Sequence, residues 1–205
     1  MLVRERLLEP PAQSRALAQM FEARREVFVD LLKWDLAVLD NRFEVDQFDD
    51  CHARYLIIAD QARGHLGSAR ILDTTRPHIL GSLFPSLSAR PVPTGPGIAE
   101  ITRFCLGRNQ SAAERRITRN HLVSAIVRHG LDHHIQTYTG VAELNWLQQI
   151  LAFGWVCRPL GPPQLLAGRM VGALAIEIDS ETPELLAANG IWTEELADER
   201  ALEAA

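Results

Sequence analysis

The spacing of hydrophobic positions changes along the chain, and it predicts the order of helices and strands. Apolar residues recur every three or four positions over residues 12–33 and 112–134, which is the spacing of amphipathic helices. Short apolar runs bounded by turn residues predict strands instead. The expected strands are RYLIIAD, LGSARIL, IAEITRFCLG, QTYTGVA, WVCRPLG and MVGALAIEID, and a further helix is expected at ELNWLQQILAFG.

The order of these elements predicts the fold class. The first two strands form a hairpin around QARGH, and the Pro-, Gly- and Ser-rich residues 74–97 predict a long loop with one short helix. Strand–helix–strand–helix–strand–strand then follows, so we expect a mixed α/β fold with the sheet mostly in chain order. The length suits a single domain over residues 1–205, whose acidic tail, 180–205, is expected to be partly helical and to fray.

Composition narrows the class of protein. The chain is 47% hydrophobic and 23% charged, which is typical of a globular domain, and no apolar run approaches the length of a membrane span. The charged start, MLVRERLLEPP, lacks the apolar stretch of a signal peptide, so we expect an unprocessed cytoplasmic protein. A net charge of −5 disfavours nucleic acid as a partner. The three widely spaced cysteines predict neither a disulfide framework nor a zinc site.

Two opposite charges stand inside the apolar stretch GIAEITRFCLG. Burying an unpaired charge is costly, so Glu100 and Arg103 need a reason to be there. A structural ion pair is the simplest interpretation. In a regular strand, however, side chains three apart point to opposite faces, so a direct pair would need a bulge. An active site is therefore the alternative for both residues.

A second group combines aromatic rings with carboxylates. Arg24, Phe28 and Trp34 lie within about three helical turns, and Asp46 and Asp49 follow in a loop-like segment. Ring faces attract cations and stack on nucleobases, and carboxylates pair with amines. The group therefore suits a ligand with a flat ring and a positive charge. Alternatively, the rings belong to the core and the aspartates cap a turn.

Other candidates are weaker. Arg70 lies in an apolar strand after two small residues, where the outer face of the sheet is an alternative to a site. His129 and His133 have a zinc-ligand spacing without an evident third ligand, so we favour a solvated helix end and expect no metal. Neither a nucleophile elbow nor a phosphate-binding glycine loop occurs. All positive residues but Lys33 are arginines, which grip carboxylates and phosphates in a fork.

Six short motifs follow one another between about residues 20 and 105. They are R-x-x-V-F at Arg24–Phe28, L-x-W at Leu32–Trp34, E-x-D-x-F-D at Glu44–Asp49, G-S-x-R at Gly67–Arg70, F-P at Phe84–Pro85 and E-x-T-R-F at Glu100–Phe104. In this order they resemble the LuxI-type acyl-homoserine-lactone synthases, the autoinducer synthases of bacterial quorum sensing. This chain departs from the family at Thr102, where serine is common, and at Leu31 and Lys33, where arginine and glycine are common.

The resemblance implies a fold and a reaction. The fold would be that of the GNAT acyltransferases, with a splayed mixed sheet and helices on both faces. Residues 12–50 would form a helical substrate-binding segment. The substrates would be S-adenosylmethionine and an acyl thioester on acyl carrier protein or coenzyme A, with no prosthetic group. Amide formation and lactone closure would then release methylthioadenosine.

The resemblance also implies roles for individual residues. Glu100 would be the base for the attacking amine, and the substrate cations would lie near Asp46, Asp49, Phe28 and Trp34. The remaining site residues would balance the carboxylates or line the substrate; they are Arg24, Arg70, Arg103, Thr102, Phe104 and Thr139. Thr139 matches a position associated with 3-oxo acyl chains.

The acyl donor and the reaction class leave alternatives. The strand–helix junction LGRNQSAAERRITRN lacks the glycine pair that cradles a coenzyme A diphosphate in related enzymes, which favours a carrier protein. Arg115, Arg116 and Arg119 would meet that acidic partner, or form a solvated helix face. A general GNAT-type N-acyltransferase acting on another amine is the alternative function. A degenerate homologue that only binds an adenosyl ligand or a partner is the non-enzymatic one.

Overall fold

The computed structural model describes residues 2–4, 10–60 and 62–194. The described residues fall into two compact units. Unit 1 takes those within Met1–Arg70, Arg103–Ala125 and Thr193–Ala205, and unit 2 takes Ile71–Thr102 and Ile126–Trp192. The expectation of a single domain over residues 1–205 stays a prediction.

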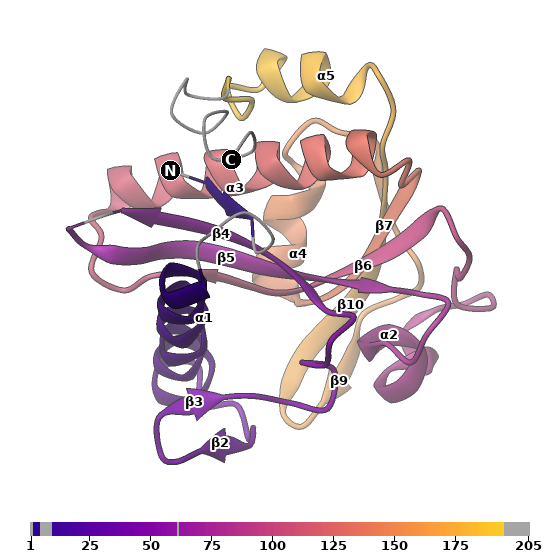
Figure 1. Ribbon diagram of the computed structural model, residues 1–205. Helices are drawn as coiled ribbons and strands as arrows, with labels where there is room; N and C mark the ends of the chain where they lie inside the picture. Colours follow the sequence, from indigo (N-terminus) through magenta and orange to yellow (C-terminus); the bar gives the residue numbers. More distant parts are fainter. Residues whose placement is uncertain (1, 5–9, 61, 195–205) are drawn as a thin grey trace. The chain divides into compact units, whose positions relative to one another are not determined.

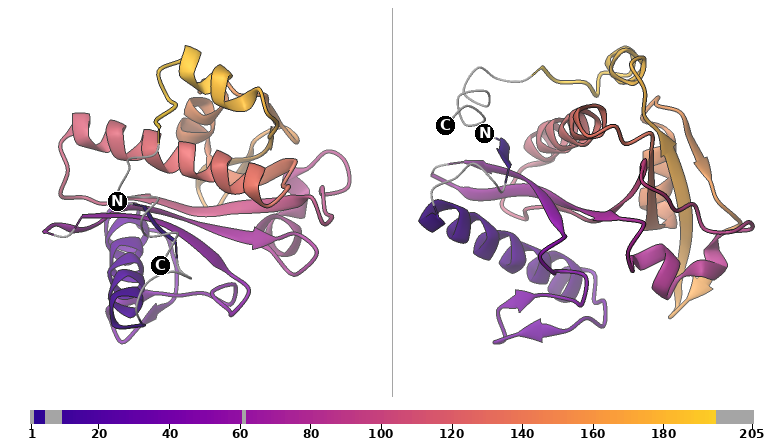
Figure 2. Two further views of the ribbon diagram at one scale, coloured as in Figure 1. Left: turned by 45° about the horizontal axis from the view of Figure 1, so that its top comes forward. Right: turned by 45° about the vertical axis from the view of Figure 1, so that its right-hand side comes forward.

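Unit 1 is built on four strands in the order β1-β4-β5-β6. These are β1 (Leu2–Arg4), β4 (Arg54–Asp60), the first part of β5 (Gly64–Asp73) and the last part of β6 (Ile98–Leu106). Helix α1 (Pro10–Arg24) covers one face of this sheet, and the first part of α3 (Ala112–Asp132) covers the other, as Figures 1 and 2 show. The predicted hairpin and the two predicted long helices are confirmed.

Helix α1 does not continue as an α-helix to the end of its predicted range. It passes into the π-helical segment η1 (Arg25–Leu31), where Leu32 N–H donates to the carbonyl of Val27 at 2.9 Å. The wider turns then end at Lys33, which has a positive φ of 57°. Such π-helical turns are frequent at functional sites, and this one joins α1 to the loop that follows. Spacing alone predicts the helix and does not distinguish the two geometries.

A small hairpin follows η1. Strands β2 (Val38–Leu39) and β3 (Phe43–Glu44) pair antiparallel around the left-handed residues Asp40 and Asn41. The sequence analysis did not predict these two-residue strands, because they are too short to show an alternating pattern. Their importance lies in Glu44, which β3 places in a fully buried position.

The core of unit 1 beside η1 consists of apolar residues from α1, η1 and β6. Ala23, Val27, Phe28 and Cys105 are buried together. The half-buried Leu32, Trp34 and Leu36 pack against them. Burial of such side chains contributes roughly 1.5–3 kcal/mol each, which holds η1 against the end of β6.

Unit 2 contains the other strands in the order β6-β7-β10-β8, with β9 also pairing with β10. The strands are β7 (Thr137–Glu143), β8 (Cys157–Pro159), β9 (Gln164–Leu166) and β10 (Arg169–Glu177). Its helices are α2 (Ile79–Leu83), η2 (Pro85–Leu87), α4 (Leu144–Leu151) and α5 (Thr182–Ala188). β6 and β7 are parallel and the other pairs are antiparallel, so the predicted mixed sheet is confirmed.

The first half of strand β6 pairs with β7. In this parallel pairing Ile98 lies opposite Thr137 and Ile101 lies opposite Gly140. Strand β7 continues beside β10 as far as Glu143. Two residues further along β6, Arg103 has a φ of 50°, in the left-handed region. A non-glycine residue held there costs of order 1–3 kcal/mol and resets the alternation of side chains. The left-handed Arg103 is thus a departure from the regular strand, the condition on which the alternation of Glu100 and Arg103 depended.

Two further expectations have outcomes here. Helix α5 shows that the tail is partly helical, while residues 195–205 lie outside the described residues. His129 is buried and its Nδ1 lies 2.7 Å from the hydroxyl of Tyr138, so a solvated helix end was wrong for this residue. In the described part of the chain, no helix combines the length and apolarity that crossing a membrane requires.

Candidate functional site

Three arginines and three carboxylates of unit 1 close into a ring of alternating charge. Each arginine bridges two carboxylates, and each carboxylate bridges two arginines. We call this set the charge ring; its members, in order around it, are Arg24, Asp49, Arg70, Asp46, Arg103 and Glu44.

Two corners of the charge ring are forked ion pairs. Arg24 donates from Nη1 and Nη2 to the two oxygens of Asp49, at 2.7 and 2.8 Å. Arg70 donates in the same way to Asp46, at 2.6 and 3.0 Å. Two parallel bonds fix the orientation of both partners, so α1 and β5 are locked onto the loop that carries the aspartates.

The remaining contacts complete the charge ring. Arg24 Nε donates to Glu44 at 2.6 Å, and Arg70 Nη1 lies 2.7 Å from Oδ1 of Asp49. Arg103 donates from Nη2 to Glu44 at 3.0 Å and to Asp46 at 2.7 Å. Because Arg103 belongs to β6 and Glu44 to β3, the charge ring also joins these two strands.

Burial divides the charge ring into a hidden part and a reachable part. The side chains of Arg24, Arg70 and Glu44 are fully buried and that of Asp49 is 1% exposed. Only Arg103 and Asp46, at 9% and 12%, reach solvent. A ligand that approaches the charge ring therefore meets a guanidinium and a carboxylate side by side.

Mutual pairing keeps the buried members charged. Burial alone would raise the pKa of Asp49, but its hydrogen bonds and ion pairs with Arg24 and Arg70 hold that pKa well below its usual range. Burial likewise disfavours the charged Arg24, and the bonds to Asp49 and Glu44 outweigh it, so the pKa of Arg24 is raised. Arg70 shows the same balance, and its pKa is raised.

Uncharged groups brace the aspartates from behind. The hydroxyl of Tyr55 donates to Asp49 Oδ1 at 2.8 Å. The backbone N–H of Asp46 donates to Asp49, and that of Phe48 donates to Asp46, both at 2.8 Å. The two carboxylates thus cap their own turn, as one sequence interpretation held, and also enter the charge ring, as the other required.

Two aromatic rings border the reachable end of the charge ring. Phe28 and Trp34 stack with ring centroids 4.8 Å apart and planes 24° from parallel. The guanidinium carbon of Arg103 lies 5.7 Å from the centroid of Phe28. Phe28 is buried and Trp34 is half-buried, so the core interpretation holds for Phe28 and in part for Trp34. Phe104, next to Arg103, is half-buried.

Glu100 occupies a different position, in unit 2. Its side chain is fully buried, and its two oxygens accept the backbone N–H groups of Ile79 and Leu80 at 2.7 Å each. These N–H groups open helix α2, whose N-cap residue His78 makes no capping bond with its own side chain. A carboxylate from β6 therefore serves as the missing cap. Glu100 and Arg103 each have partners of their own, as the expectation for separate roles required.

The two threonines named from the sequence lie in unit 2. Thr139 on β7 stands opposite Glu100 on β6, is fully buried, and donates from its hydroxyl to the carbonyl of Ala99 at 3.4 Å. Thr102 is buried at 8% exposure. The structure accounts for the Thr139 hydroxyl within the sheet and assigns neither residue to a ligand.

Sequence reasoning missed two residues of this site. Glu44 lay within a recognised motif but was not named as a site residue, although it links Arg24 to Arg103. Tyr55 was not singled out, because a tyrosine at the start of an apolar strand is usually a core residue. Arg24 and Arg103 stand among apolar residues in the sequence, and buried arginines need carboxylate partners. That need is the signal that could have pointed to Glu44.

The comparisons agree with these observations. The family model described as autoinducer synthase matches residues 11–186. An acyl-homoserine-lactone synthase of Ralstonia nicotianae is 31% identical over 84% of this chain and 86% of its own. An isovaleryl-homoserine lactone synthase of Bradyrhizobium diazoefficiens is 30% identical over 83% of this chain and 76% of its own.

Solved structures of similar proteins extend the likeness to the fold. The CoA-dependent acyl-homoserine lactone synthase BjaI, solved with SAM and isopentyl-CoA, has a TM-score of 0.80 at 26% identity, covering 100% of this chain and 98% of its own. The same enzyme was also solved with MTA. The GNAT-like fold implied by the resemblance is thus confirmed. The chain belongs to the autoinducer synthase family of acyl-homoserine-lactone synthases, which are acyltransferases.

Proposed function

We propose that this chain makes an acyl-homoserine lactone from S-adenosylmethionine and an acyl thioester, and releases methylthioadenosine. The observation that carries the proposal is the reachable end of the charge ring, where Arg103 and Asp46 lie beside the Phe28–Trp34 stack. S-adenosylmethionine carries two cations, a carboxylate and a flat base, so it matches each of these groups. The complexes of BjaI with SAM and MTA support this choice.

The charge ring would act by positioning. Asp46 would attract the ammonium or sulfonium of the substrate, and Arg103 would hold its carboxylate. The half-buried Trp34 would contact the adenine or the sulfonium with its ring. Arg24, Arg70 and Asp49 are too buried to touch a ligand, so we assign them to holding the other members in place.

Glu100 would serve the first chemical step as base. The α-amine must lose a proton as its nitrogen attacks the thioester carbonyl, and Glu100 accepts that proton directly or through one water. The new C–N bond forms as the C–S bond breaks, and the thiolate leaves. Each Glu100 oxygen accepts one backbone N–H, and these two bonds fix the position of the carboxylate.

Lactone closure is the second step. An oxygen of the substrate carboxylate attacks its own γ-carbon, the bond from that carbon to the sulfonium breaks, and methylthioadenosine leaves with the electron pair. No further acid or base is needed, since the leaving group is neutral. An arginine at the carboxylate would fix the attacking oxygen, and Arg103 is the arginine of the charge ring that solvent reaches furthest.

The acyl donor would be a thioester on acyl carrier protein, and a coenzyme A thioester is the competing donor. Of the three arginines proposed for carrier docking, Arg115 donates to the carbonyl of Gly107 at 2.9 Å and so braces a turn. Arg119 bonds to Asn120, and Arg116 is exposed. We therefore retain Arg116 as the docking candidate. Thr139 stays a proposal for 3-oxo chain preference.

The test is a reaction of the purified chain with S-adenosylmethionine and a panel of acyl thioesters on both carriers. We expect an acyl-homoserine lactone and methylthioadenosine in equal amounts, identified by mass spectrometry. Acyl transfer to another amine without methylthioadenosine would instead establish the general N-acyltransferase. Ligand binding without turnover of any donor would establish a degenerate homologue.

A further inference from the structure

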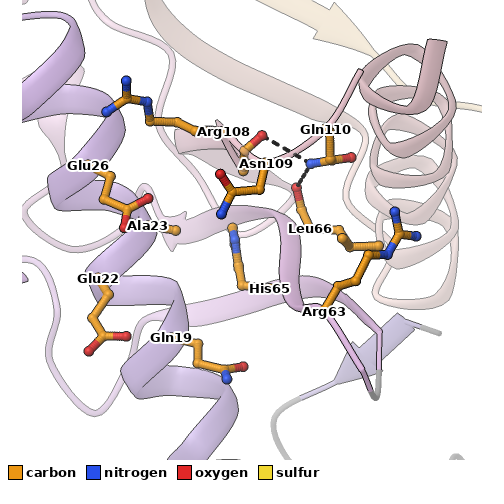
Figure 3. Close-up of a pocket in the computed structure, with 11 residues that line it drawn as sticks. Gln19, Glu22, Ala23, Glu26, Arg63, His65, Leu66, Arg108, Asn109 and Gln110 are labelled. Atoms are coloured by element: carbon orange, nitrogen blue, oxygen red, sulfur yellow. Dashed lines mark hydrogen bonds between the residues drawn. The ribbon is translucent and has the colours of Figure 1, made fainter. Parts of the chain in front are cut away.

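A polar hollow of about 400 Å³ opens beside the turn between β6 and α3, in unit 1. Figure 3 shows Glu22 of α1 and Glu26 of η1 on one side and Asn109 and Gln110 of the turn on the other, with the side chain of Arg108 reaching from the turn toward Glu26. The first turn of a helix that follows a strand is a ready site for phosphate groups, because its N–H groups lack partners within the helix. This hollow therefore raises the question of whether a donor's diphosphate is bound here.

The first turn of α3 is already occupied by a carboxylate of its own. Ser111 donates from its backbone N–H and its hydroxyl to Glu114 Oε2, both at 2.8 Å. The backbone N–H of Glu114 donates back to the Ser111 hydroxyl at 3.3 Å. This is a capping box, and it places a carboxylate where a phosphate would otherwise approach the first turn of α3. The bonds from Ser111 and Arg63 lower the pKa of Glu114, so the carboxylate is charged.

The side chain of Gln110 holds the turn before α3 in place. Gln110 donates from Nε2 to the carbonyls of Leu66 and Gly107, at 2.7 and 3.1 Å, as the dashed lines in Figure 3 mark. Its Oε1 accepts the hydroxyl of Thr118 at 2.6 Å. Both the N–H₂ group and the oxygen of the Gln110 amide are therefore hydrogen-bonded within the protein. These bonds hold the capping box in a fixed place.

Of the basic residues near this turn, Arg63 is paired and His65 is uncharged, whereas Arg108 lines the hollow and is exposed. Arg63 donates from Nη1 to Glu114 Oε1 at 2.6 Å. Burial lowers the pKa of His65 to about 4, so its ring carries no charge near neutral pH. A diphosphate at the first turn of α3 would meet the Glu114 carboxylate and would have to draw Arg63 away from it. Glu22 and Glu26 line the hollow beside this turn.

We propose that Glu114 is a specificity-determining residue that keeps the diphosphate of a coenzyme A thioester from the first turn of α3. Donor recognition in this chain then relies on the acyl-pantetheine arm and, on a carrier protein, on the carrier itself. The inference rests on the proposed function and concerns its donor class. It sets this chain apart from BjaI, which is described as CoA-dependent.

The test compares two donors that share acyl chain and thiol and differ only in the nucleotide: acyl-CoA and acyl-pantetheine. For the chain as it is, we expect kcat/KM values for the two within roughly threefold of each other, since Glu114 keeps the diphosphate from the first turn of α3. Glu114→Gln keeps the capping box, which accepts glutamine, and releases Arg63. It should raise kcat/KM for acyl-CoA roughly fivefold, through KM, and leave acyl-pantetheine unchanged.

A matched control makes the same charge change in the first turn of another helix. Glu184→Gln in α5 removes an exposed carboxylate and should alter neither donor. Calorimetry with coenzyme A alone should show the same roughly fivefold tightening for Glu114→Gln. A hundredfold preference of the unchanged chain for acyl-CoA over acyl-pantetheine, or no response to Glu114→Gln, would overturn the inference. Lack of product from every donor would contradict the proposed function instead, and the calorimetry would still decide the role of Glu114.

Discussion

The charge ring and Glu100 are two solutions to one problem, a buried carboxylate. In the charge ring, each carboxylate is matched with guanidinium groups, so charge meets charge. At Glu100, two uncharged backbone N–H groups at the start of α2 hold the carboxylate, and these donors do not neutralise it. The first arrangement suits a rigid support, whereas the second holds a carboxylate in place without a guanidinium among these two donors.

The comparison separates positioning from chemistry. Forked pairs such as Arg24–Asp49 resist change, since breaking one leaves a buried charge without compensation. The Ile79 and Leu80 donors to Glu100 are uncharged backbone N–H groups, so removing the charge of Glu100 leaves neither of these donors as a buried charge. Experiments that remove one member from each arrangement should therefore give different patterns of stability and turnover.

The largest expected effect is loss of stability on removing a buried corner of the charge ring. Arg24→Met should lower the free energy of unfolding by about 3–5 kcal/mol, because Asp49 and Glu44 are left charged and buried. Urea denaturation measures the change. Arg25→Met, one residue along, removes an exposed arginine whose pair with Asp30 is 3.5 Å long, and should cost about 0–1 kcal/mol. Equal losses in the two variants would show that the charge ring is not a buried unit.

The second effect concerns the cap of α2. In Glu100→Gln the side-chain amide presents an N–H₂ group to one of the two backbone donors, so one hydrogen bond becomes a clash of donors. The free energy of unfolding should fall by about 1–3 kcal/mol. Denaturant unfolding of the variant checks this value. An unchanged stability would mean that Glu100 does not hold α2.

The third effect distinguishes the reachable end of the charge ring from its hidden part. Arg103→Lys keeps the charge but loses the fork to Glu44 and Asp46. Because Arg103 lies at the reachable end of the charge ring, kcat/KM for S-adenosylmethionine should fall roughly tenfold, equal to about 1.4 kcal/mol, with about 1–3 kcal/mol lost in stability through the missing hydrogen bonds. A stability loss without a kinetic one would make Arg103 a structural residue.

The smallest effect appears at alkaline pH. Burial and the negative Asp49 hold the pKa of Tyr55 well above its usual range of about 10. The folded state therefore keeps a proton that the unfolded state loses, so this residue stabilises below pH 10 and its contribution is lost as pH rises further. The loss is about 1.4 kcal/mol per pH unit. Tyr55→Phe should lack this part of the decline in unfolding free energy between pH 10 and 11, and parallel curves would contradict the account.

Much of the fold could be predicted from the sequence, because it follows from spacing. The long helix at α3 and the strands β4, β5 and β10 show their apolar periods directly. The π-helical turns of η1 and the left-handed Arg103 could not be predicted, since both are set by packing and leave no local pattern. The two-residue strands β2 and β3 are below the length at which alternation is visible.

The site was predictable in its residue types and not in its partnerships. The motifs named Arg24, Asp46, Asp49, Arg70 and Arg103, but their closure into a ring depends on contacts between residues 20 to 60 positions apart. Likewise, no local feature of β6 indicates that Glu100 would cap a helix 20 residues earlier. Long-range hydrogen bonds depend on the tertiary structure, which local spacing does not reveal. Only the order of the six motifs indicated that these residues act together.

The turnover of Glu100→Gln tests the central claim most directly. The reaction is run well below the unfolding temperature of the variant, and the rate is divided by the folded fraction, so that loss of the α2 cap does not count as loss of chemistry. The account predicts that the formation of acyl-homoserine lactone and methylthioadenosine falls roughly 100-fold or more. A rate within threefold of the unchanged chain would contradict it and leave Glu100 as a cap alone.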